Sequence, residues 1–149
     1  MKLFDRLKQK SVGYYLFLVA AALDVITLII YTVYIAGGGR ADAIVFIALV
    51  LSVAVVAVLF FYEGLFGDIM AAVPAVCFAV TLAFTLEGGV GNIADSVENI
   101  VMYGHKELAV YNYVLAVLSI VGFITSAVAV SCAEQRGISE VTNKSAPTA

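Results

Sequence analysis

Four long apolar runs constrain this chain more than any other feature. Together they contain a single charged residue, Asp24, and each is 18 residues or longer. A helix needs about 20 apolar residues to cross the hydrocarbon core of a bilayer, whereas barrel strands are shorter and alternate in polarity. The sequence therefore predicts an all-α integral membrane protein built as a four-helix bundle. The predicted spans are residues 12–36, 43–62, 69–86 and 108–133.

The overall composition supports a membrane protein and excludes two other classes. Hydrophobic residues make up 63% of the chain and charged residues only 13%, whereas a soluble domain is about half apolar and a quarter charged. The formal net charge of -3 leaves no general basic surface for a nucleic acid. The lipid bilayer is therefore the first partner that we expect.

The distribution of lysine and arginine predicts the orientation of the spans. Loops that stay in the cytoplasm carry an excess of these residues. Six of the eight lie in the two terminal segments, and the other two, Arg40 and Lys106, lie in the loops after the first and third spans. We therefore expect a multi-pass protein of the cell membrane with both termini in the cytoplasm. The six terminal residues are Lys2, Arg6, Lys8, Lys10, Arg136 and Lys144.

The two terminal segments are expected to lie outside the bundle. Residues 1–11 combine apolar and basic positions, which predicts an interfacial segment that either anchors the topology or recognises anionic lipid. Residues 134–149 are polar and too short to form a core. We expect this segment to be a disordered cytoplasmic tail.

The loop between the third and fourth spans is the longest, from Glu87 to Glu107. Its first part is rich in glycine, and apolar residues then recur with helical spacing from Ile93 to Val101. This pattern predicts one short amphipathic helix on the outer side. Such a helix either covers the ends of the bundle or presents a surface to a partner. The candidate partner surface consists of Asp95, Glu98, Tyr103 and His105.

Asp24 lies at the middle of the first span. Because an acid at the centre of a bilayer costs about 2.5–3.5 kcal/mol, we expect it to face the bundle. The other spans carry small polar residues near their own midpoints, which predicts a polar layer at one level. Such a layer is either a hydrogen-bond clasp between helices or part of an ion path. The predicted layer consists of Asp24, Thr27, Ser52, Thr81 and Ser119.

The sequence contains no pattern typical of an enzyme. It has no metalloprotease motif, no set of serine, histidine and acid with catalytic spacing, and no pair of acids within the spans. Cys77 and Cys132 lie at different depths and are not expected to form a disulfide. His105 is the single histidine, which is weak support for a metal site. We expect no catalytic activity, cofactor or metal.

Two functions remain open. The first is a non-enzymatic accessory or structural subunit that binds a larger membrane partner, which fits the short loops and the structured outer element. The second is a small homo-oligomeric transporter or channel that couples transport to protons through Asp24. Four helices with one acid in the first span resemble the small multidrug transporters, although the tryptophan of their aromatic cage has no counterpart here.

Overall fold

Four long helices make up nearly all of the described chain. The computed structural model describes residues 12–61, 70–99 and 101–144, and the side chains of residues 15–59, 70–99 and 101–132. The predicted interfacial segment 1–11 and residues 145–149 of the predicted tail lie outside these ranges. Within the described ranges every regular element is helical, which confirms the predicted all-α class.

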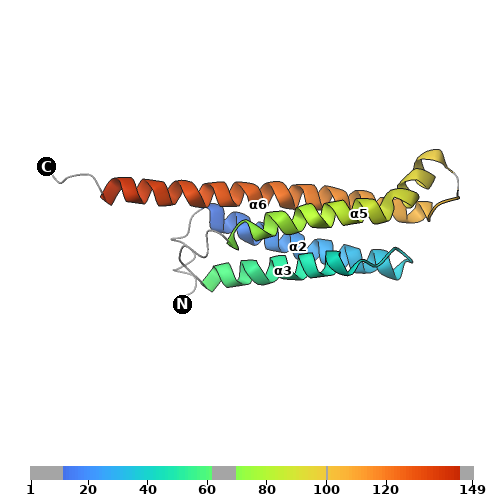
Figure 1. Ribbon diagram of the computed structural model, residues 1–149, viewed down its shortest axis with the longest axis horizontal. Coiled ribbons are helices and arrows are strands. Elements are labelled where there is room, and N and C mark those ends of the chain that lie inside the picture. The colour runs from blue at the N-terminus through green and yellow to red at the C-terminus, as the bar shows by residue number, and fades with distance from the viewer. Residues whose placement is uncertain (1–11, 62–69, 100, 145–149) are drawn as a thin grey trace.

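The helices are arranged as an elongated bundle (Figure 1). Three of them, α2, α5 and α6, are long and apolar enough to cross a membrane. The apolar part of α3 that the structure describes is shorter, Ala43–Leu59. The elements are α2 (Val12–Ala36), α3 (Ala43–Phe61), α5 (Val73–Glu98), the short 3-10 helix η1 (Lys106–Leu108) and α6 (Ala109–Lys144).

Neighbouring helices of the bundle run antiparallel. Helix α2 packs on α3 and α6, and α5 packs on the same two helices from the other side. The start of α2 and the end of α6 therefore lie at one end of the bundle (Figure 1). We call the opposite end, which carries residues 37–42 and 99–108, the distal end.

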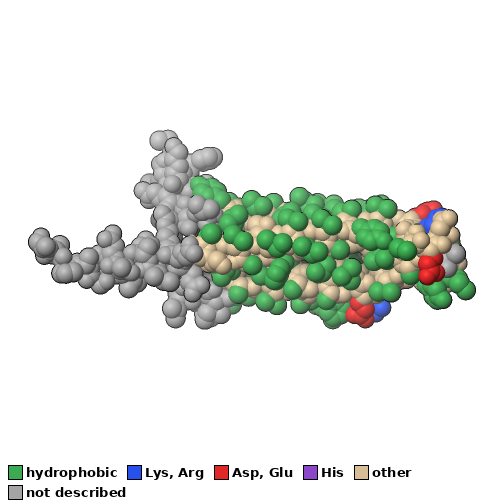
Figure 2. Space-filling view, turned by 90° about the horizontal axis from the view of Figure 1, so that it is seen from above, with side chains coloured by type: hydrophobic (Ala, Val, Ile, Leu, Met, Phe, Trp, Pro, Cys, Tyr) green, Lys and Arg blue, Asp and Glu red, His purple; other side chains and the backbone are tan. Residues whose placement is uncertain are grey.

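The sides of the bundle are apolar and its interior contains polar residues. Valine and isoleucine side chains such as Ile29, Ile47 and Val76 are more than half exposed. On the face shown in Figure 2, hydrophobic side chains cover the length of the bundle, and charged side chains gather toward the distal end. This distribution suits helices surrounded by lipid, because lipid solvates apolar surface and polar groups need partners inside.

The amphipathic helix predicted between the third and fourth spans is not a separate element. Helix α5 runs without interruption from Val73 to Glu98 and so includes the glycines that were expected to form a loop. Only residues 99–105 separate α5 from η1. The last turns of α5, drawn in yellow, bend away from the bundle axis (Figure 1), as glycine in a helix allows. Continuing a helix requires no new nucleation, which is why the glycines do not end it.

Helix α6 is also longer than predicted. The sequence predicts a disordered tail from Glu134, whereas the structure continues the helix to Lys144. Alanine, glutamate, glutamine and arginine follow Cys132 directly, and all four are strong helix formers. The polar composition of this segment indicates that it has no hydrophobic core of its own. The same composition does not prevent the backbone from continuing the helix.

Candidate functional site

Asp24 is fully buried at the centre of α2 and contacts the neighbouring helix α3. The hydroxyl of Ser52 donates a hydrogen bond to Oδ2 of Asp24. The other oxygen, Oδ1, has no hydrogen-bond partner in the described protein. One oxygen of the Asp24 carboxyl is therefore hydrogen-bonded to α3, whereas the other is buried without a partner in the described protein.

The other residues of the predicted polar layer are also fully buried. Thr27 donates a hydrogen bond to the carbonyl of Leu23 in its own helix, at 2.7 Å. Thr81 and Ser119 make no hydrogen bond through their hydroxyl oxygens. Unpaired buried polar atoms are uncommon in native proteins, so these two hydroxyls require an explanation.

A second polar cluster lies at the distal end and was not predicted. The Asn92 side chain of α5 donates to Oδ1 of Asn112 in α6 at 3.1 Å, and to the Tyr34 hydroxyl of α2 at 3.4 Å. The Asn112 amide donates to the carbonyl of Thr85 at 3.3 Å. Oδ1 of Asn92 accepts the backbone N–H of His105 at 2.8 Å. Three helices and the 99–105 connection are thus joined by two buried amides.

Two glycines permit the close packing of α5 on α6. A Cβ atom at Gly89 would overlap the Asn112 amide, and a Cβ atom at Gly122 would overlap the Phe78 ring. Small residues at helix contacts let backbones approach closely in membrane proteins. Gly89, in the stretch of α5 that was expected to be a loop, therefore serves the packing of α5 on α6.

Asp95 holds the connection between α5 and η1. Its carboxylate accepts the backbone N–H groups of Met102, Tyr103 and Gly104 at 2.8 to 3.1 Å. The residue lies in the polar end of α5, beyond the uncharged stretch that ends at Leu86. Burial acts to raise the pKa of Asp95, but the three N–H donors and His105 outweigh it and lower that pKa. The carboxylate therefore stays ionised and fixes the loop.

Three of the four residues predicted to form the outer partner surface are exposed, and the fourth is buried. Asp95 is fully buried, so it is not available to a partner, whereas Glu98, Tyr103 and His105 are exposed. Four apolar or aromatic side chains of the same segment, Tyr103 among them, are strongly exposed. Val97, Val101, Met102 and Tyr103 are 71–74% exposed.

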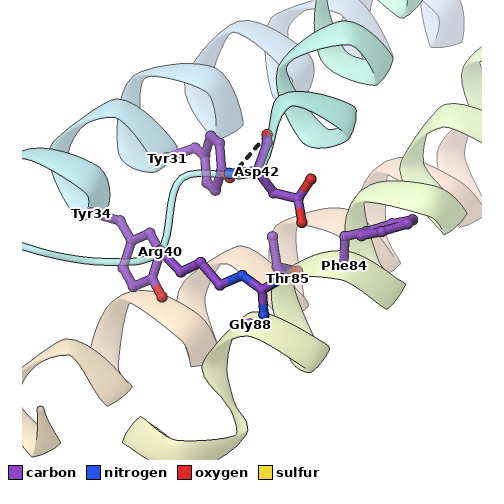
Figure 3. Close-up of a pocket in the computed structure, with 7 residues that line it drawn as sticks. All are labelled: Tyr31, Tyr34, Arg40, Asp42, Phe84, Thr85 and Gly88. Atoms are coloured by element: carbon purple, nitrogen blue, oxygen red, sulfur yellow. Dashed lines mark hydrogen bonds between the residues drawn. The ribbon is translucent and has the colours of Figure 1, made fainter. Parts of the chain in front are cut away.

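The turn between α2 and α3 lines a small pocket at the distal end (Figure 3). The Tyr31 hydroxyl accepts the backbone N–H of Asp42 at 2.7 Å, and the Asp42 carboxylate accepts the N–H of Ile44 at 3.2 Å. Asp42 thereby caps the start of α3. Arg40 stretches over Gly88 of α5 in Figure 3. The pocket is lined by Tyr31, Tyr34, Arg40, Asp42, Phe84, Thr85 and Gly88.

Residues that bind metals are not gathered in the part of the chain that the structure describes. No group of three or more histidine, cysteine, aspartate or glutamate side chains could hold an ion there. Cys77 and Cys132 are both free, as the difference in depth predicted.

One sequence signal could have revealed the distal cluster. Asn112 lies inside an otherwise apolar span, where an amide commonly bonds to a neighbouring helix. Its partner Asn92 lies in the Glu87–Glu107 segment, which the sequence predicts to be a loop outside the spans. In comparisons with known protein families, with characterised proteins and with solved structures, nothing matches this chain.

Proposed function

We propose that this chain is a small non-enzymatic subunit of the cell membrane that binds a larger membrane partner through its distal end. The observation that carries this proposal is the exposed apolar surface formed by Val97, Val101, Met102 and Tyr103. It lies beyond the uncharged part of α5, on the last turn of that helix and on the connection after it, which Asp95 and Asn92 hold in place. Exposed apolar patches on ordered elements are typical of contact sites, and methionine and tyrosine are enriched there.

The same proposal includes four membrane crossings with both termini in the cytoplasm. Helix α3 runs alongside the three longer helices (Figure 1), and its described residues are uncharged. Arg40 and Lys106 are the only lysine or arginine residues of the described distal end. The other six lie in segments expected at the opposite end, which supports a distal end that faces outward.

Affinity purification of the full chain from its native membrane, with mass determination of the complex, tests partner binding. We expect a heteromer of defined stoichiometry that is lost in a Val101→Asn, Met102→Gln double variant. The matched control is Val117→Ala, an exposed apolar position on the side of α6, which should keep the partner. A pure homo-oligomer, or a heteromer that the double variant retains, contradicts the proposal.

The buried carboxyl favours a second candidate, a homo-oligomeric proton-coupled transporter or channel. Asp24 is fully buried, and one of its oxygens has no partner in the described protein. Acids within membrane spans often mark ion paths. Purified protein in liposomes should then move protons, and Asp24→Asn should abolish the flux while Ser131→Ala leaves it unchanged. Equal flux in wild type and Asp24→Asn contradicts this candidate.

A further inference from the structure

Three buried hydroxyls differ from the other serine and threonine residues of the bundle. A hydroxyl in a helix commonly donates to the carbonyl four residues earlier. Four residues here do so, whereas Thr81, Ser119 and Ser126 have no partner in the described protein although they are fully buried. The four that bond within their own helix are Thr27, Thr85, Thr125 and Ser131.

Thr81 of α5 and Ser119 of α6 lie at the same level of the bundle. Phe78 of α5 packs directly on Gly122 of α6. From that contact, Thr81 is three residues further toward the distal end along α5, and Ser119 is three residues further along the antiparallel α6. Equal numbers of residues mean equal rise along two helices. The two fully buried residues therefore lie at the same height in the bundle.

Asp24 lies close to the same level. Gly37 contacts Leu108 at the distal end, where α2 and α6 meet. Asp24 lies thirteen residues before Gly37 in the chain, and Ser119 lies eleven residues after Leu108. Both counts lead from this contact toward the other end of the bundle. At 1.5 Å per residue the two positions differ by about 3 Å in height. The unpaired oxygen of Asp24 and the two unpaired hydroxyls thus lie within about one or two residue rises of the same height. Ser126, two turns further along α6, lies outside this layer.

The chemistry of this layer matches a water molecule better than a metal cation. The two hydroxyl protons are not used by backbone carbonyls, so they need an acceptor, and Oδ1 of Asp24 is an acceptor that needs a donor. A cation would bind the oxygens but leave the two protons without an acceptor. A buried water makes about three hydrogen bonds to otherwise unsatisfied polar groups.

We propose that one ordered water occupies the bundle core, where it accepts hydrogen bonds from Thr81 and Ser119 and donates one to Asp24. The Asp24–Ser52 hydrogen bond joins α2 to α3, and the proposed water joins this pair to α5 and α6. The water would connect all four helices at mid-height, as the two asparagines connect three of them at the distal end. Neither partner binding nor proton transport is required for this site.

The test compares the unfolding rates of serine variants in bicelles with added SDS, followed by pulse proteolysis. Ser119→Ala removes a ligand of the water, and Ser131→Ala on the same helix is the matched control for the higher helix propensity of alanine. Relative to this control, Ser119→Ala should unfold about threefold faster, the usual effect of one hydrogen bond between membrane helices. Thr81→Val should also unfold faster.

Two results would overturn the proposal. If the layer is dry, Ser119→Ala removes an unsatisfied hydroxyl and unfolds more slowly than Ser131→Ala. If the site binds a cation, NaCl or LiCl slows the unfolding of wild type relative to choline chloride at equal ionic strength, and Asp24→Asn abolishes that difference. If the site holds water, wild type should unfold at the same rate in NaCl, LiCl and choline chloride. The Ser119→Ala comparison separates water from a dry layer, and the three salts on wild type separate water from a cation. Neither measurement needs a folded variant of Asp24.

Discussion

The Ser52 hydroxyl donates a hydrogen bond to the Asp24 carboxyl, and this contact joins two helices through residues 28 positions apart in the chain. Both side chains are fully buried. The contact explains how a carboxyl is accommodated in a span without facing lipid. It also makes the replacement of Asp24 a sensitive measure of how the bundle is held together.

Asp24→Asn should keep the fold, and Asp24→Leu should destabilise it. Asparagine retains an oxygen that accepts the Ser52 hydrogen bond, whereas leucine leaves that buried hydroxyl without a partner, at a cost of about 1–3 kcal/mol. Pulse proteolysis in bicelles measures the difference. Equal stability of Asp24→Leu and wild type would show that the polar layer does not hold the helices.

Gly89→Ala should destabilise the bundle, and Gly88→Ala should not. A Cβ atom at Gly89 would overlap the Asn112 amide, while a Cβ atom at Gly88 would meet only Arg40, at 3.8 Å. Overpacking of this kind costs about 1–3 kcal/mol, and alanine in a helix is otherwise favoured over glycine. The adjacent substitutions therefore form a matched pair in an unfolding assay. Equal effects would contradict the close contact of α5 with α6.

Asp95→Ala should release the connection between α5 and η1. The carboxylate accepts the N–H groups of Met102, Tyr103 and Gly104. Without it, the amide hydrogen exchange rates of these residues should rise at least tenfold, and each tenfold rise corresponds to about 1.4 kcal/mol of opening free energy. Glu98→Gln is the control because Glu98 is exposed on the same helix. Unchanged exchange in Asp95→Ala would mean that other contacts order the loop.

The pH dependence of the same loop follows from the lowered pKa of Asp95. A carboxyl whose pKa is lower in the folded state adds stability above its unfolded pKa of about 3.9. That stability is lost as the pH falls through the lower, folded pKa. After correction for intrinsic exchange, protection of residues 102–104 should be constant from pH 7 to pH 5 and fall only below about pH 4. Loss of protection between pH 7 and pH 5 would assign the effect to another group.

The orientation of the bundle can be tested with introduced cysteines in a Cys132→Ala background. A membrane-impermeant maleimide added to intact cells should label Lys106→Cys, because the distal end is expected to face outward. It should label Lys144→Cys only after the cells are opened. The reverse pattern would place both termini outside.

The regular structure was largely predictable because hydrocarbon admits few alternatives. Uncharged runs of about 20 residues must form helices that satisfy their own backbone groups, and α2 and α3 begin at the predicted residues. The helix ends were harder to predict. Gly88, Gly89 and Gly91 look like a loop because glycine is a poor helix former, but α5 continues through them to Glu98.

The burial of Asp24 follows from the same solvent argument, because a carboxyl is too costly to expose to lipid. The sequence does not show which residue donates a hydrogen bond to Asp24, because several small polar residues share its depth. The packing of α2 on α3 selects Ser52. The distal cluster depends still more on packing. Asp95 resembles a surface acid in the sequence, but the bend of the chain after Glu98 brings three backbone N–H groups to it.

Local composition and the nature of the surrounding lipid thus determined that this chain forms long helices and where its charges can lie. The tertiary structure alone decided which polar atoms are paired. The reason is that hydrogen bonds depend on distances of a few tenths of an ångström between helices, which helix register and glycine contacts set, and which no local pattern encodes.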